Sequence, residues 1–106
     1  MTNLEVLKNA LLTVTQNVGH YEAREKTDAY IVWAEDGTGI SSWSDNKRKA
    51  GSITGTADYF TKTENDPNVG KIEAAFGSIR IGWRLNSVQY ERDTGYIHTE
   101  WVWEVA

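Results

Sequence analysis

The sequence predicts an α+β domain in which two helices pack on one face of a largely antiparallel sheet. Two segments place apolar residues at the spacing of an amphipathic helix, and four others are rich in the β-branched and aromatic residues that favour strands. The predicted order along the chain is helix, strand, strand, helix, strand, strand. Helices gathered on one face of a sheet bury the apolar surface of both. With 106 residues, 40% of them hydrophobic and 25% charged, the chain is expected to form a single domain, residues 1–106.

Both helices are predicted from the spacing of their apolar residues. The first is expected over residues 3–15, with Thr2 or Asn3 as the N-cap. The second is expected over residues 66–77, where Asp66 is a favourable N-cap and Pro67 fits the first helical position because it has no N–H to satisfy. The apolar residues that share one face are Leu4, Leu7, Leu11 and Val14 in the first helix, and Val69, Ile72, Phe76 and Ile79 in and just after the second.

Two strands are predicted between the helices. Residues 29–35 are apolar on both faces, which is typical of a central strand. Residues 51–62 form the second strand, and alternation puts one set of residues on a single face: Ile53, Gly55, Ala57 and Tyr59. Residues 20–28 are polar and are expected to be irregular. Residues 36–50 are mostly small and polar, and we interpret them as a long loop of the kind that often carries function.

The last two strands, residues 79–91 and 96–105, are expected to form an antiparallel hairpin. The segment Asp93-Thr94-Gly95 fits a three-residue turn with the glycine in the left-handed conformation. Such a turn sets the register, which aligns an apolar face and an opposite-charge pair. The pairs it predicts are Leu85 with Trp103, Arg84 with Glu104 and Tyr90 with His98.

Tryptophan is abundant, with five in the chain, and most are expected in the core. Those assigned to the core are Trp33, Trp83, Trp101 and Trp103. Trp43 falls instead in the polar loop, where it is either an anchor for a protein contact or a side chain folded back over the sheet.

The same loop holds the one basic cluster of the chain, Lys47-Arg48-Lys49. Three interpretations stay open for it: a solvated loop tip, a phosphate-binding patch with Trp43 stacking on a base, or a protein contact. We take Trp43, Lys47, Arg48 and Lys49 as candidate interface residues. The complementary acidic surface is expected near Glu22, Glu25 or Glu91.

Composition excludes several classes of protein. The net charge of −4 argues against a strongly basic nucleic-acid binder. The absence of cysteine rules out disulfides, thiolate zinc sites and a cysteine nucleophile. No apolar run approaches the ~20 residues needed to span a bilayer, and the first residues do not resemble a secretory signal. We therefore expect no membrane partner and folding in the cytoplasm.

No pattern of catalytic residues is present in the sequence. The only two histidines, His20 and His98, lack the spacing of a metal site. The chain has no G-x-S-x-G nucleophile elbow, and Gly37-Thr38-Gly39 does not continue as a dinucleotide or phosphate-binding motif. We predict that the protein is not an enzyme and has no catalytic residue, cofactor or metal.

Several segments resemble the tail terminator or tail completion proteins of long, non-contractile tailed phages and of prophages in Gram-positive bacteria. The resemblance covers nearly the whole chain. It is carried by Tyr30-Ile31-Val32-Trp33-Ala34-Glu35-Asp36-Gly37, Asp45-Asn46-Lys47, Gly55-Thr56-Ala57-Asp58-Tyr59-Phe60-Thr61-Lys62, Asp66-Pro67-Asn68-Val69-Gly70-Lys71-Ile72, Trp83-Arg84-Leu85-Asn86-Ser87-Val88-Gln89-Tyr90 and Trp101-Val102-Trp103-Glu104.

The resemblance implies a structural virion protein in the tail or neck, made in the host cytoplasm. Proteins of this family form a homo-oligomeric ring, commonly a hexamer, at the head-proximal end of the tail. The implied partners are the tail tube protein and the head connector or completion protein, with no specific nucleic-acid binding. The alternative that stays open is a small ligand-binding or regulatory module, monomeric or dimeric, with a ferredoxin-like sheet.

Overall fold

A computed structural model describes residues 3–38, 43–44, 47–48 and 52–105 of the chain. It confirms the α+β class, with two helices and a five-stranded, mostly antiparallel sheet in the order β1-β2-β5-β7-β6. β1 and β2 are parallel to each other, and the other neighbours in this sheet are antiparallel. The elements are α1 (Asn3–Leu12), β1 (Val18–His20), β2 (Ala29–Gly37), β3 (Trp43–Ser44), β4 (Lys47–Arg48), β5 (Ile53–Thr61), α2 (Pro67–Gly77), β6 (Ile81–Glu91) and β7 (Tyr96–Val105).

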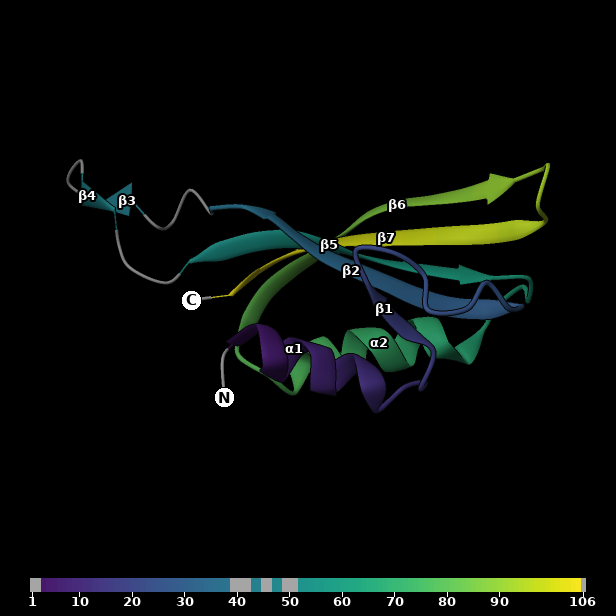
Figure 1. Ribbon diagram of the computed structural model, residues 1–106, viewed down its shortest axis with the longest axis horizontal. Helices are drawn as coiled ribbons and strands as arrows, with labels where there is room; N and C mark the ends of the chain where they lie inside the picture. Colours follow the sequence, from purple (N-terminus) through teal and green to yellow (C-terminus); the bar gives the residue numbers. More distant parts are fainter. Residues whose placement is uncertain (1–2, 39–42, 45–46, 49–51, 106) are drawn as a thin grey trace.

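Both helices lie along the same side of the sheet (Figure 1). Leu7 and Leu11 of α1 and Ile72 and Phe76 of α2 are fully buried. Their partners in the core come from the central strands: Ile31, Trp33, Ala57, Tyr59, Trp101, Trp103 and Val105. The predicted apolar faces of the helices and of β5 are therefore confirmed. As expected, Asp66 caps α2, because its carboxylate accepts a hydrogen bond from the backbone N–H of Asn68 at 2.9 Å.

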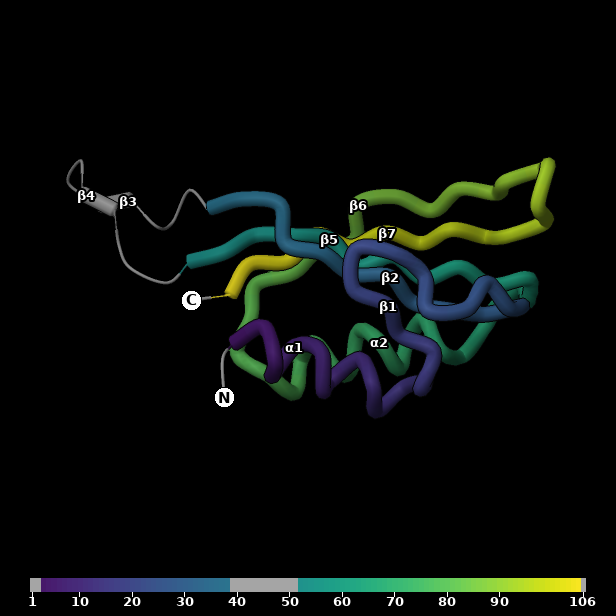
Figure 2. The backbone as a smooth tube through the Cα atoms, in the orientation of Figure 1, coloured from purple at the N-terminus to yellow at the C-terminus, as the bar shows by residue number. Residues whose placement is uncertain are grey.

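The order of elements differs from the prediction because the chain contains three further short strands. β1 falls partly in the segment expected to be irregular, and three residues are too few to show a period. The chain after β1 turns back across the sheet (Figure 2). It passes so close to Gly19 that a Cβ there would lie 2.7 Å from the backbone nitrogen of Arg24. β3 and β4 lie in the predicted loop 36–50 and form a separate two-stranded sheet.

The predicted hairpin register is wrong. Leu85 lies opposite Trp101 instead of Trp103, and Arg84 lies opposite Val102 instead of Glu104. One cause is the turn, since Glu91 pairs with Tyr96 and leaves four residues between the strands. Gly95 is nevertheless left-handed as expected, with φ +79°.

The second cause of the register shift is a bulge in β6. The pairing shifts between Leu85 and Ser87, so that Asn86 is an extra residue with no partner in the ladder. The turn and the bulge each shift the pairing by one residue. Trp83 and Leu85 lie beyond both shifts, so their side chains return to the predicted side of the sheet. Tyr90, which lies between the turn and the bulge, pairs with Ile97 instead of His98 and changes face.

Helix packing also differs from the prediction, because the helices cover only part of their side of the sheet. They lie under β2, β5 and β7, whereas β6 packs against the core at its first residue, Ile81, and then rises away from the helices as the edge strand (Figure 1). Trp83 is 38% exposed, and its ring centroid lies 5.7 Å from that of Phe76 in α2. The expectation that Trp83 belongs to the core is therefore wrong, whereas Trp33, Trp101 and Trp103 are buried as predicted.

Candidate functional site

An exposed apolar surface runs along β6 on the side of the sheet that carries the helices. We call it the β6 stripe, and its members are Trp83, Leu85, Val88 and Tyr90, exposed by 38%, 48%, 58% and 65%. Each lies opposite a β7 residue on the side of the sheet that holds Trp101 and Trp103, but beyond Ile81 the helices leave β6 exposed. Four large apolar side chains in a row on a single strand indicate a contact surface.

The backbone of β6 is available as well as its side chains. β6 is the last strand of the sheet, and no other strand in the described part of the chain pairs with its outer edge. Proteins usually protect such an edge with lysine, proline or a very short strand. β6 has 11 residues and neither Lys nor Pro. Its edge can therefore accept a further strand while its stripe buries apolar surface.

The bulge at Asn86 keeps the stripe continuous. Without an extra residue, alternation would send Val88 and Tyr90 to the face opposite Leu85. Asn86 and Ser87 instead occupy that opposite face together, where the Nδ2 of Asn86 donates to Glu100 at 2.6 Å. The sequence signal for this feature is weak, because Asn-Ser is a polar pair that also occurs in regular strands.

The sequence-predicted interface residues lie in another part of the chain. Trp43 pairs with Arg48, and Ser44 with Lys47, in the backbone ladder of β3 and β4. Lys49 lies outside the described residues. The role expected for this segment stays a prediction. The β6 stripe was missed because Trp83 was assigned to the core and the predicted register put Leu85 and Tyr90 on opposite faces of the hairpin.

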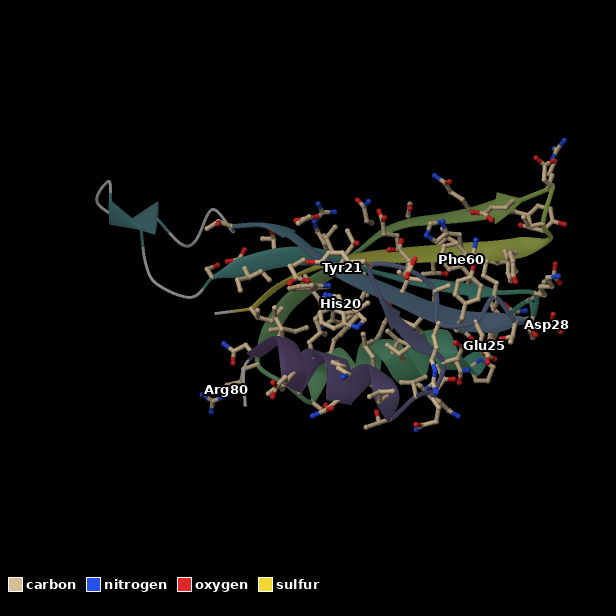
Figure 3. The ribbon with its side chains drawn as sticks, viewed as in Figure 1. His20, Tyr21, Glu25, Asp28, Phe60 and Arg80 are labelled. Carbon is tan, nitrogen blue, oxygen red and sulfur yellow. The ribbon has the colours of Figure 1, made fainter. Side chains whose placement is uncertain are left out.

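The opposite face of the sheet carries a polar and aromatic cluster. The rings of Tyr30, Phe60 and His98 stack across β2, β5 and β7, with centroids 4.7 and 4.2 Å apart. Figure 3 labels Phe60 of this stack. An open hollow of about 520 Å³ lies over them and is bounded on one side by the segment that follows β1.

Ionisable groups meet beside this stack. His98 Nε2 lies 2.6 Å from Asp58 Oδ1, and His98 Nδ1 lies 3.6 Å from Glu91 Oε2. Asp58 also lies directly opposite Glu100 in the ladder. Burial is the main reason that the pKa of Asp58 is raised, and Glu100 raises it further, against the opposing effect of His98. Asp58, His98 and Glu100 offer ligand atoms within 4.8 Å of one another, a nitrogen and oxygen set that a divalent ion can use.

The other histidine has a separate environment. His20 Nε2 lies 2.5 Å from Glu35 Oε1, and the ring stacks on Trp33 with centroids 3.9 Å apart. The hydrogen bond from His20 is the main cause that lowers the pKa of Glu35. His20 is the last residue of the edge strand β1, and its ring also stacks on that of Tyr21, with centroids 4.2 Å apart (both labelled in Figure 3). Neither histidine cluster was predicted, because both depend on pairing between strands that are distant in sequence.

Comparison with known proteins assigns no family to this chain. No protein-family model matches it, and no characterised protein matches it either. None of the helices in the described residues has the length and apolar character needed to cross a membrane. The fold and the β6 stripe define a class only: a small α+β protein with one long, apolar sheet edge open to a partner.

Proposed function

We propose that the protein is a structural subunit that assembles with copies of itself through β6. The observation that carries this proposal is the β6 stripe on an edge strand with a free backbone. A surface that combines apolar side chains with unpaired backbone groups associates strongly and would otherwise aggregate. Self-assembly uses both features at once.

We further propose, following the sequence resemblance, that the assembly is the ring that completes a phage tail and joins it to the head. A ring needs two different patches on each subunit, because each copy contacts its two neighbours differently. The β6 stripe is suited to one patch. The β3–β4 segment with Trp43, Lys47, Arg48 and Lys49 remains our candidate for a second contact, either with the neighbour or with the connector.

The test places one charge on either face of the same exposed strand. Leu85→Lys puts an ammonium in the middle of the stripe, and Gln89→Glu is the control that puts a charge on the opposite face. Both should fold, as judged by circular dichroism and thermal melting. We expect Leu85→Lys to abolish self-association in sedimentation velocity and to prevent ring formation on purified tail tubes in electron micrographs, while Gln89→Glu does neither. If Leu85→Lys assembles like the parent protein, β6 is not the assembly surface.

The second contact is tested separately. Trp43→Ala and the triple change of Lys47, Arg48 and Lys49 to Glu should reduce tail completion without changing the fold. If both variants complete tails as well as the parent protein, this segment is not an interface.

A ligand-binding module is the second candidate, favoured by the hollow over Tyr30, Phe60 and His98. Stacked rings next to paired carboxylates would suit a planar, cationic ligand. The helix-first order of the chain differs from the β-α-β-β-α-β order of ferredoxin-like domains. Thermal-shift screening with aromatic cations tests this function. A ligand bound in the hollow should raise the melting temperature of the parent protein and have less effect on His98→Ala, which lacks one of the three stacked rings.

A further inference from the structure

The side chains of β6 follow a pattern that reads the same in both directions from its bulge. Asn86 and Ser87 sit at the centre, both on the face away from the helices. Moving outward, each end has a stripe residue, then a polar residue, then a stripe residue. The sequence of residues is Leu85, Arg84 and Trp83 in one direction and Val88, Gln89 and Tyr90 in the other.

We propose that two copies of this chain pair through β6 in an antiparallel, two-fold symmetric ladder centred on the bulge. This inference rests on the proposed function, in that β6 is the self-association surface, and it names the partner strand and the register. Leu85 of each copy lies opposite Val88 of the other, and Trp83 opposite Tyr90. All four stripe residues then face apolar side chains on the same side of the joined sheet.

The bulge restricts the register. In an antiparallel pair, residues opposite each other must point to the same face. A shift by two residues would place Leu85 opposite Asn86 or Ser87 opposite Val88, and each of these pairs joins a stripe residue to a polar one on the other face. Among registers that pair the strand along its length and so cross the bulge, the one centred between Asn86 and Ser87 keeps every pair matched. It also aligns the two extra residues, so that both strands bend at the same place.

Charge and strand length favour a second β6 as the occupant. In this register Arg84 is a diagonal neighbour of Glu91 in the other copy, on the face away from the helices, and diagonal pairs are within reach of long side chains. The symmetry provides this opposite-charge pair twice. The other edge of the sheet, β1, has three residues and could cover only a small part of the 11 of β6. A copy of β6 is the strand of this fold that matches its length.

The β6-paired dimer is the state of the free protein before it assembles into the ring. A two-fold pair covers β6 completely and presents two identical ends, whereas a ring that joins a tail to a head has two different ends. The free protein is therefore a dimer that protects its apolar edge, and the dimer opens when subunits join the tail.

Cysteine cross-linking tests the register directly, because the chain has no cysteine of its own. Leu85→Cys and Val88→Cys variants are purified separately, mixed in equal amounts, allowed to exchange and then oxidised. Positions directly opposite one another have a Cα spacing within the range of disulfides. We expect a disulfide dimer in the mixture at several times the yield of either variant alone. A mixture of Leu85→Cys with Tyr90→Cys, which are diagonal in this register, is the matched control and should give little product.

The outcomes separate this inference from the proposed function. Equal yields in both mixtures, or more product with Tyr90→Cys, would overturn the register. A free protein that sediments as a monomer or as a ring would overturn the dimer. Either result would leave assembly through β6 standing if Leu85→Lys still blocks it. As a further readout, the Leu85–Val88 disulfide dimer should fail to complete tails until it is reduced.

Discussion

The indole ring of Trp103 lies directly over Gly55 on the neighbouring strand. A Cβ built at Gly55 would lie 2.7 Å from Cη2 of Trp103, closer still to Cζ2, and in collision with the backbone oxygen of Ala34. The two residues are a direct pair between β5 and β7, so neither can move away without disturbing the ladder. The glycine provides the space that a tryptophan needs to lie flat in the core.

Gly55→Ala should therefore destabilise the protein by about 2–3 kcal/mol, the effect of forcing extra volume into a packed core. The control is Gly82→Ala on β6, where the added Cβ would come no closer than 4.0 Å to a neighbour. That change should be neutral or slightly stabilising. Urea denaturation of both variants gives the comparison, and equal losses would show that Trp103 can shift.

Trp103 and Trp83 lie opposite each other but should respond very differently to truncation. Trp103→Ala should reduce the free energy of unfolding by about 3–5 kcal/mol, as expected for a buried aromatic side chain. Trp83→Ala should lose clearly less, because more than a third of its side chain is already in water. The melts must be done at protein concentrations too low for association. Equal losses would mean that Trp83 belongs to the core after all.

Asp66 connects the cap of α2 to the core. Its Oδ2 accepts hydrogen bonds from Tyr59 at 2.7 Å and from Thr61 at 2.6 Å. Burial by itself would raise the pKa of Asp66, but these bonds and the one from Asn68 outweigh burial and lower it. Asp66→Ala should therefore destabilise by about 1–2 kcal/mol at pH 7.

The pH dependence follows from the direction of the shift. A carboxyl group with a lowered pKa contributes its stability above the usual aspartate pKa and loses it as the pH falls through the lowered value. The difference between the parent protein and Asp66→Ala should thus shrink below about pH 4. Asp28→Ala, which changes a carboxylate that is 91% exposed, serves as the control and should show little effect at either pH. A difference that stays constant from pH 7 to pH 3 would contradict the role of the ionised carboxylate.

Glu100→Gln should stabilise the protein at neutral pH. It removes a like charge directly opposite Asp58, an effect of about 0.5 kcal/mol for a cross-strand pair, and keeps an oxygen for Asn86. Because the pKa of Asp58 is raised, the protonated form of Asp58 favours the folded state. This stabilisation is complete in acid and is lost as the pH rises through the raised pKa. The gain should therefore appear at pH 7 and vanish in acid, where Asp58 is protonated. Glu64→Gln, an exposed change, is the control, and a gain that does not depend on pH would indicate another cause.

Local patterns in the sequence determined much of this fold. The spacing of apolar residues located both helices, and the Asp66-Pro67 pair marked the start of α2, because capping and amphipathic periodicity involve residues only a few positions apart. Alternation likewise located β5 and β7 and the side of each that faces the core. The left-handed Gly95 also followed from its place in a short turn.

The tertiary structure alone decided what the protein offers to partners. The hairpin register depended on one bulged residue, Asn86, and on one extra residue in the turn. Both features change the backbone energy only slightly, and the spacing of hydrophobic residues gives no sign of either. Whether Leu85 is core or surface depended on how far two helices extend across a sheet. The meeting of Asp58 with His98 required β5 and β7 to pair, although 40 residues separate them in the sequence. The sequence sets which faces are apolar, but the extent of the covering layer decides which apolar face remains open.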